Sequence, residues 1–245
     1  MKIALIGYGK MGREIERAAA QRGIAVGPIF DDANNARGRG LTKAALRGVD
    51  VCIDFSTPAA CLDNIKAAAN AGVSIVVGTT GWYDKLPQAR KIVRTKRIGL
   101  LYAPNFSLGM NVFTRLVAAA ADYFDTFEMY DAAVSEIHHT AKADSPSGTA
   151  LLLGQVILDH MKRKKELLTA PSRGAIKRSQ LHVTSTRVGS VVGTHEIVFD
   201  SESDSIALVH TAKNRTGFAL GALVGAEWLS GKRGCFTMND VLESL

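Results

Sequence analysis

Residues 135–151, with the sequence SEIHHTAKADSPSGTAL, concentrate side chains that can transfer protons and bind anions. His138 and His139 end a predicted strand, so their rings should point to opposite faces and only one should reach a given cleft. An imidazole donates a proton near neutral pH, and Lys142 adds a positive charge or a second proton donor. One histidine is therefore a candidate acid–base catalyst, and the other a supporting group.

The same segment predicts the start of a helix near Ser147. Its serine and threonine hydroxyls, with the free N–H groups of a first helical turn, can bind a carboxylate. Taken alone, two adjacent histidines more often end a packed strand, with rings bonded to the backbone. No metal is predicted, because HExxH is absent and adjacent strand histidines diverge. The neighbouring lysine and hydroxyl groups favour catalysis.

The opening MKIALIGYGKMGREI predicts a dinucleotide site. Gly7 permits a tight turn, Gly9 lets a pyrophosphate approach the backbone, and Gly12 brings the following helix against the strand. The N-terminus of that helix offers unpaired N–H groups to phosphates. Glycines that only shape a turn are the alternative, but the position between a strand and a helix favours the dinucleotide.

Asp31 and Asp32 follow Gly12 by about twenty residues, where a carboxylate commonly accepts hydrogen bonds from the ribose hydroxyls of NAD. A 2′-phosphate would meet these negative charges, so NADH is favoured over NADPH. Lys10, Arg13 and Arg37 are near enough in sequence to leave use of both cofactors open. The pair is also typical of ordinary turns.

The first hundred residues alternate short apolar runs with helical patterns, which is the rhythm of parallel βαβ units. The predicted strands are residues 2–6, 24–30, 51–55, 73–77 and 98–102, and the predicted helices include 10–22 and 58–71. We predict an α/β fold with a Rossmann-type doubly wound parallel sheet. Gly78 and Thr79, after the fourth strand, and Asn105, after the fifth, would lie at its carboxyl edge, where they could hold a nicotinamide or simply form turns.

The rhythm changes after residue 105, which predicts a second, α+β domain with a mixed sheet for substrate binding and oligomerisation. Its expected elements are helices at 110–124 and 147–165 and strands at 127–138, 181–187, 194–199 and 205–211, with a basic loop at 162–178. An apolar helix at 217–228 should return to the first domain. The predicted domains are therefore 1–105 with 216–245, for the dinucleotide, and 106–215, for the substrate.

Composition narrows the class of protein. The chain has 245 residues, 47% of them hydrophobic, with a net charge of +7 and three cysteines. The cysteines show no disulfide or CxxC spacing, and the apolar runs are too short or interrupted for a membrane span or an export signal, so we expect a cytoplasmic protein. The basic residues gather mainly at 162–178, which is more typical of a solvated loop than of a nucleic-acid site, and would help to attract an anionic substrate.

These motifs together resemble the dihydrodipicolinate reductase family. GYGKMG, DFSTP, GTTGW, APNFSLGMN, EIHHTAKADSPSGTAL, RVGSVVGTHEI and AKNRTGFALGA occur in the family's order and span almost the whole chain. The resemblance implies NAD(P)H-dependent reduction of a cyclic imine dicarboxylate, 4-hydroxy-tetrahydrodipicolinate, to tetrahydrodipicolinate in lysine and diaminopimelate biosynthesis. It also implies a homotetramer, without nucleic-acid or membrane partners.

The resemblance assigns roles to individual residues. His138 corresponds to the acid–base catalyst and Lys142 to a proton donor and charge partner, while His139, Gly148 and Thr149 correspond to substrate-binding residues. The cofactor contacts expected from the motifs and the resemblance are Gly7, Gly9, Lys10, Met11, Gly12, Asp31, Gly78, Thr79, Thr80, Ala103, Asn105, Phe106, Arg215 and Phe218.

The chain departs from the family at one point and leaves two other functions open. Many members read HHRHK where this chain has Thr140 and Ala141 between the second histidine and the lysine, which reduces positive charge and could weaken substrate affinity. Another NAD-dependent dehydrogenase, such as one resembling aspartate dehydrogenase, would differ in its substrate. A non-catalytic dinucleotide-sensing or nucleic-acid-binding protein is disfavoured by the intact His138 and Lys142 and by the lack of an RNA-binding or helix-turn-helix pattern.

Overall fold

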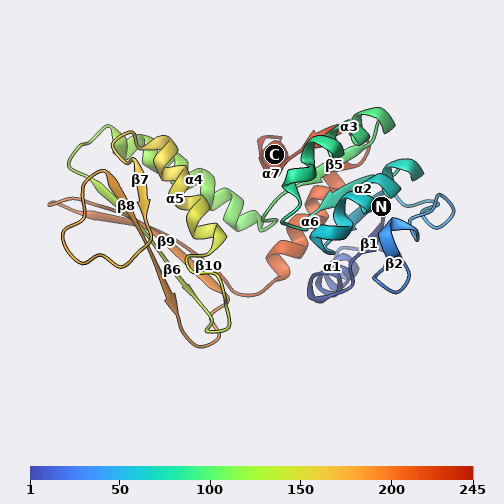
Figure 1. The fold of residues 1–245 in the computed structure, drawn as a ribbon, viewed down its shortest axis with the longest axis horizontal. Coiled ribbons are helices and arrows are strands. Elements are labelled where there is room, and N and C mark those ends of the chain that lie inside the picture. The colour runs from blue at the N-terminus through green and yellow to red at the C-terminus, as the bar shows by residue number, and fades with distance from the viewer. Residues whose placement is uncertain (245) are drawn as a thin grey trace. The chain divides into compact units, whose positions relative to one another are not determined.

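The computed structural model describes residues 1–244, and the chain divides into two compact units. The first unit combines Met1–Asn111 with Arg215–Leu245, and the second is Val112–Asn214 (Figure 1). The first unit is thus built from two separate parts of the chain.

A six-stranded parallel sheet organises the first unit, in the order β11-β5-β4-β3-β1-β2. Its strands are β1 (Lys2–Ile6), β2 (Ala25–Phe30), β3 (Val51–Asp54), β4 (Ser74–Val77), β5 (Gly99–Tyr102) and β11 (Gly234–Phe236). Its helices are α1 (Lys10–Gln21), α2 (Pro58–Ala71), α3 (Leu86–Lys96), α6 (Thr216–Leu229) and α7 (Met238–Glu243). The order reverses at β1, which lies between β2 and β3, and open α/β sheets bind ligands at the carboxyl end of such a switch point.

Helices cover both faces of this sheet, and β1 shows why. Ile3 and Leu5 point to one side and pack in a core with α1 and α6, whereas Ala4 and Ile6 point to the other and pack with α2 and α3. A strand that is buried on both faces has a nearly continuous apolar sequence, as β1 has. The predicted doubly wound parallel sheet is confirmed.

The second unit contains a five-stranded mixed sheet in the order β10-β9-β6-β8-β7. Its strands are β6 (Asp131–His138), β7 (Glu166–Leu168), β8 (Gln180–Arg187), β9 (Gly193–Asp200) and β10 (Ser205–Ala212), and the accompanying helices are α4 (Leu108–Asp125) and α5 (Gly148–His160). Strand β6 runs parallel to β8 and antiparallel to β9. The predicted mixed sheet is confirmed.

One face of this sheet is packed against helices. In β6, exposed and buried residues alternate strictly toward its end, and Glu136 and His138 share the buried face with Val134. On the same face, Phe124 of α4 stacks on Phe199 of β9 with ring centroids 4.5 Å apart. The fold therefore buries the end of the histidine motif beside the helices.

Several predicted boundaries were wrong. The strand expected at 127–138 begins only at Asp131, because Phe127 and Tyr130 close turns with N–H bonds to Phe124 and Phe127. The helix expected at 147–165 ends at His160, and the basic segment that follows turns back, with the Lys164 ammonium held by the Gln180 carbonyl at 2.6 Å. The loop expected at 162–178 contains strand β7. Strands β7 and β11 and helices α3 and α7 were not predicted; both strands are three residues long, too short for a clear periodicity.

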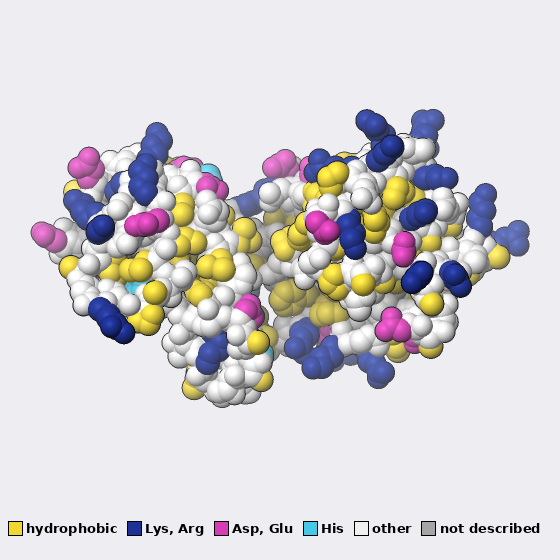
Figure 2. Space-filling view, in the orientation of Figure 1, with side chains coloured by type: hydrophobic (Ala, Val, Ile, Leu, Met, Phe, Trp, Pro, Cys, Tyr) yellow, Lys and Arg dark blue, Asp and Glu magenta, His cyan; other side chains and the backbone are white. Residues whose placement is uncertain are grey.

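Positive charge is dispersed over the part of the surface that Figure 2 shows. Figure 2 shows lysine and arginine side chains scattered over the visible face of the first unit among acidic and apolar ones, rather than in one band. Within residues 1–244, no helix combines the length and the apolar character needed to cross a membrane.

Candidate active site

The glycine turn after β1 leaves no room for side chains at two of its glycines. Gly7 adopts φ +87°, and a Cβ there would lie 2.3 Å from the Phe55 carbonyl oxygen; a Cβ on Gly12 would lie 2.2 Å from the carbonyl oxygen of Gly7. At Gly9, which precedes α1, a Cβ would meet nothing within 4 Å. The turn thus brings the first turn of α1 against the strand and leaves open space beside Gly9, directly before the N-terminus of the helix, where an anion site is expected.

A cavity of about 430 Å³ lies beside this turn, at the carboxyl ends of β1, β2 and β3. Gly7, Gly9, Asp31 and Asp32 are among the residues that line it. The Asp31 carboxylate accepts backbone N–H bonds from Ala33 at 3.0 Å and from Asn34 at 3.3 Å, both on the same oxygen. Asp31 therefore shapes its turn while it faces the cavity, and in the described chain neither aspartate forms an ion pair.

A buried carboxylate at the end of β3 organises the cavity wall. Asp54 has no exposed surface, and its oxygens accept bonds from the backbone N–H and hydroxyl of Ser56 at 2.9 and 2.7 Å, from Thr79 at 2.9 Å and from the Asn64 amide at 2.9 Å. Burial raises the pKa of Asp54, and these hydrogen bonds oppose the rise. Asp54 fixes the loops after β3 and β4 relative to each other, and the sequence analysis did not identify it.

The remaining predicted cofactor residues of the first unit do not line this cavity. Lys10 and Thr80 are exposed, and Arg215 and Phe218 lie at the start of α6. Met11 packs on the core, Gly78 lies against the Phe55 ring, and Ala103 and Phe106 are buried. The buried Thr79 donates a hydrogen bond to Asp54, and the Asn105 side chain accepts the Ser107 N–H. These residues lie at the start of α1, after β4 and β5, and at the start of α6. Their direct contact with a cofactor stays a prediction.

In the second unit, Glu136 is the centre of a buried polar cluster. One carboxylate oxygen accepts the Ser147 N–H at 2.8 Å, the Ser185 hydroxyl at 2.7 Å and the Arg187 guanidinium at 3.0 Å. The other accepts the Ser147 hydroxyl and lies 3.2 Å from Nδ1 of His138 and 3.5 Å from Nε2 of His195. Burial alone would raise the pKa of Glu136, but the hydrogen bonds from Ser147, Ser185 and Arg187 outweigh it and lower this pKa to about 2.

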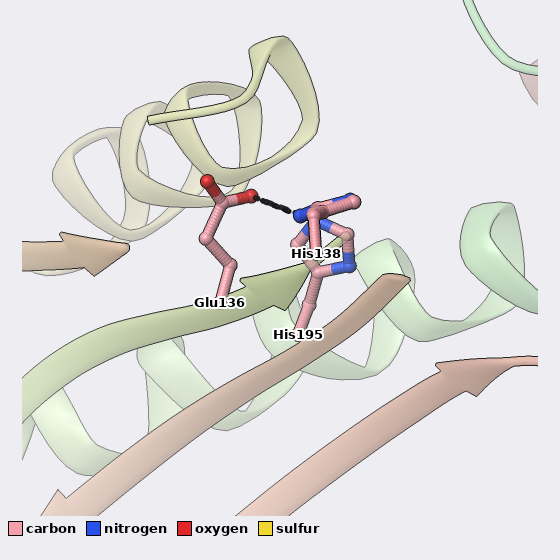
Figure 3. A group of neighbouring side chains, drawn as sticks. All are labelled: Glu136, His138 and His195. Atoms are coloured by element: carbon pink, nitrogen blue, oxygen red, sulfur yellow. Dashed lines mark ion pairs between the residues drawn. The ribbon is translucent and has the colours of Figure 1, made fainter. Parts of the chain in front are cut away.

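Two imidazoles converge on that carboxylate (Figure 3). His138 ends β6 and His195 belongs to β9, and their ring centroids are 5.2 Å apart. Burial lowers the pKa of His138, while the Glu136 carboxylate acts to raise it. Burial and the neighbouring His138 lower the pKa of His195 to about 4, so His195 is neutral near pH 7. On its other side, the His138 ring lies over Gly193, where a Cβ would stand 2.8 Å from Nε2.

The predicted charge partner and the helix start lie next to this cluster. The Lys142 ammonium pairs with the Asp144 carboxylate at 2.7 Å, and its positive charge contributes to the low pKa of His138. Ser147 caps α5 by accepting the Ala150 N–H at 3.2 Å, so Gly148 and Thr149 begin the helix. Gly148 is exposed, and Thr149, like His139 beyond the end of β6, is half-buried. The structure thus gathers His138, Lys142 and the α5 N-terminus at one end of the sheet.

Glu136, His138 and His195 are close enough to ligate a metal ion, with their ligand atoms within 4.8 Å of one another. The donor set argues for a different use. Both oxygens of Glu136 already accept hydrogen bonds, and a guanidinium cation lies 3.0 Å from one of them. These contacts favour a hydrogen-bonded proton-transfer centre over a metal centre.

Sequence reasoning missed five residues of this cluster: Glu136, Ser185, Arg187, Gly193 and His195. All except Ser185 fall inside quoted motifs, EIHH and RVGSVVGTHEI, but no spacing links them to the histidine pair. Strand pairing makes the link, because Glu136 stands opposite Ser185 on β8 and opposite His195 on β9.

Comparisons with known proteins agree along the whole chain. Residues 1–106 match the family model described as dihydrodipicolinate reductase, N-terminus, and residues 109–242 match the one described as dihydrodipicolinate reductase, C-terminus. The 4-hydroxy-tetrahydrodipicolinate reductase of Christiangramia forsetii is 40% identical over 100% of this chain and 99% of its own length. That of Archaeoglobus fulgidus is 36% identical over 99% of this chain and 100% of its own length.

The fold agrees as well. A dipicolinate-bound dihydrodipicolinate reductase from Paenisporosarcina sp. TG-14 superposes with a TM-score of 0.77 at 23% identity and covers 97% of both chains. An amine dehydrogenase from Mycobacterium smegmatis shares the fold more distantly, with a TM-score of 0.59 at 9% identity, covering 96% of this chain and 94% of its own. With both family models matched and relatives of 36–40% identity over full length, the chain belongs to the dihydrodipicolinate reductase family of nicotinamide-dinucleotide-dependent reductases.

Proposed function

We propose that this chain reduces 4-hydroxy-tetrahydrodipicolinate, a cyclic imine dicarboxylate, to tetrahydrodipicolinate in the synthesis of lysine and diaminopimelate. The observation that carries the proposal is the acid–base centre at the end of β6: a buried histidine beside a lysine and the N-terminus of α5. Full-length relatives named for this activity support it.

His138 supplies the proton. Loss of water from the hydroxylated ring gives a conjugated imine, and a bound reduced nicotinamide supplies the hydride that reduces it. The product of hydride addition is an enamine, and the His138 imidazolium protonates its ring carbon. Its buried Nδ1 faces Glu136, so Nε2 is the nitrogen that donates. Lys142 stabilises the negative charge that develops on the substrate and assists protonation.

The start of α5 anchors one of the two substrate carboxylates. The N–H groups of Gly148 and Thr149 and the Thr149 hydroxyl are the donors, and the helix dipole adds to their attraction for an anion. His139 contributes a further substrate contact. A structural neighbour described as dipicolinate-bound supports a ring dicarboxylate as the ligand class.

The dinucleotide domain, residues 1–105 and 216–245, holds the cofactor. The cavity beside the glycine turn takes the adenosine and pyrophosphate portion, with Gly7, Gly9, Lys10, Met11 and Gly12 at the phosphates. The residues after β4 and β5, Gly78, Thr79, Thr80, Ala103, Asn105 and Phe106, together with Arg215 and Phe218, surround the nicotinamide region.

NADH is favoured over NADPH. Asp31 faces the cavity with one carboxylate oxygen free of the turn, and Asp32 adds a second negative charge that no ion pair neutralises in the described chain. A ribose diol can donate to such a carboxylate, whereas a 2′-phosphate is repelled. NADPH remains usable through Lys10 or Arg13.

The substrate domain, residues 106–215, binds substrate and assembles the chain into a homotetramer. The sheet face opposite the helices carries Ile137 and Val209, which are 37% and 56% exposed, and β10 forms an open edge. Exposed apolar residues on the open face of a sheet favour a partner surface. Light scattering on the purified protein tests the assembly, and a monomer at micromolar concentration would refute it.

The three free cysteines favour a reducing compartment, in agreement with a cytoplasmic location that cell fractionation would check.

A coupled assay tests the activity directly. The substrate is generated fresh, and the fall in nicotinamide absorbance is followed with NADH and with NADPH side by side. We expect substrate-dependent oxidation that is faster with NADH. Protein that binds NADH yet oxidises neither cofactor would instead indicate another dehydrogenase or a non-catalytic sensor.

A further inference from the structure

Glu136 makes an unusual number of contacts for a side chain that the reaction does not consume. Its side chain has no exposed surface, yet it receives bonds from two other segments of the second unit: the α5 cap through Ser147, and β8 through Ser185 and Arg187. A buried carboxylate is costly unless it is paired and hydrogen-bonded, and here both oxygens are satisfied. The charge is therefore held in one place with one orientation.

Both imidazoles lie close to the second oxygen, Oε2, with His138 nearer than His195. His138 Nδ1 lies 3.2 Å away, and it has no well-aligned hydrogen-bond partner in the described chain. Such catalytic contacts are often long before substrate binds, and they tighten as the ring becomes charged. The Oε2 atom thus marks where the Nδ1–H of a protonated His138 points.

We infer that Glu136 is a positioning residue for the proton donor: its fixed carboxylate keeps hydrogen on Nδ1 of His138, directs Nε2 to the substrate and stabilises the imidazolium. This inference rests on the proposed function, since it assumes that His138 is the acid. Glu136 touches neither substrate nor cofactor in this account, and it acts through His138. Ser147, the N-cap of α5, also donates hydrogen bonds to this carboxylate. One buried charge therefore fixes both the proton donor and the helix end that binds the substrate carboxylate.

The charges that surround His138 show why this carboxylate is needed. Burial disfavours the imidazolium most, Lys142 after β6 and Arg187 on β8 disfavour it further, and Asp144 compensates only in part while it is paired to Lys142. His195 on β9 is close, but it carries no charge near neutral pH because its pKa is about 4. Glu136 is the nearest group that favours the protonated ring.

The first test is the pH dependence of Glu136→Gln, which keeps the shape and removes the charge. The active form of His138 is protonated, so kcat/KM falls as pH rises through the pKa of His138. Removing a negative charge 3.2 Å away lowers this pKa, and the falling limb should move to lower pH by roughly one to three units. We expect kcat to fall about tenfold or more, while Glu136→Asp keeps the limb near its wild-type position.

Glu202→Gln is the matched control. Glu202 is exposed in the turn that joins β9 to β10, at the opposite end of β9 from His195. The charge change is the same, but the His138 cluster is untouched, so activity should stay within about twofold and the pH limb should not move. A similar shift in both variants, or none in Glu136→Gln, would overturn the inference.

Nuclear magnetic resonance of ¹⁵N-histidine protein supplies a readout that does not depend on turnover, with His138→Gln used for assignment. In the wild type we expect neutral His138 to carry hydrogen on Nδ1, and in Glu136→Gln we expect a lower His138 pKa. Hydrogen on Nε2 in the wild type refutes the positioning role, even if Glu136→Gln does not fold. An inactive wild type that shows the expected tautomer would instead refute the proposed reaction and leave the positioning of His138 supported.

Discussion

Replacing Gly193 with alanine should displace the proton donor without disturbing the fold. Gly193 begins β9, and a Cβ there would lie 2.8 Å from Nε2 and 3.2 Å from Cδ2 of His138. Ordinary van der Waals contact begins at 3.4 Å, so the ring must move by about 0.6 Å. Because a displacement near 1 Å in a catalytic geometry can cost about 10²-fold, we expect Gly193→Ala to lower kcat by roughly ten- to a hundredfold.

Stability should respond differently. The new methyl group meets an imidazole ring that is held by a hydrogen-bonded carboxylate, so strain should cost about 1 kcal/mol or somewhat more. An alanine in a strand also loses less backbone entropy on folding than a glycine, which offsets part of that cost. Thermal unfolding should therefore shift by only a few degrees, and NADH affinity should be unchanged because Gly193 lies outside the first unit.

The assay compares kcat, KM and NADH binding for wild type, Gly193→Ala and Gly174→Ala. Gly174 lies in the loop before β8, with nothing within 4 Å of an added Cβ, and serves as the control. A Gly193→Ala enzyme with wild-type kcat would show that the His138 ring does not work from the position seen in the structure. An equal loss in both variants would point to a general effect of the substitution.

Four further substitutions test other parts of the account. His138→Gln and Lys142→Ala should each cut turnover by about 10²-fold or more with NADH binding retained, as measured by steady-state kinetics and fluorescence titration; a wild-type rate in either variant would refute its role. Asp31→Ala should weaken NADH more than NADPH, and an unchanged ratio of the two KM values would remove Asp31 from ribose binding. Asp54→Asn should destabilise the first unit by about 2 kcal/mol. The new amide N–H₂ is a donor, and it must face either the Asn64 amide or the groups of Ser56 and Thr79, all of which donate to Asp54 in the wild type. Unfolding by denaturant at the wild-type midpoint would contradict this expectation.

Local sequence determined the first unit to a large extent. An apolar run, three spaced glycines and a helical pattern define β1, its turn and α1 through contacts between near neighbours, and the steric limits at Gly7 and Gly12 follow from that geometry. The histidine motif likewise identified the end of β6 and the capped start of α5, because strand alternation and helix capping act over a few residues.

The polar cluster was decided by tertiary structure. Glu136, Arg187 and His195 carry no signal that relates them to one another along the chain. They meet because β6 pairs with β8 in parallel and with β9 antiparallel, in a register that sets Glu136 against His195 and His138 against Arg187. The same holds for Asp54, whose partners come from α2 and from the loops after β3 and β4. Register depends on the packing of whole strands against their helices, so sequence spacing alone could name the proton donor but not the buried carboxylate beside it.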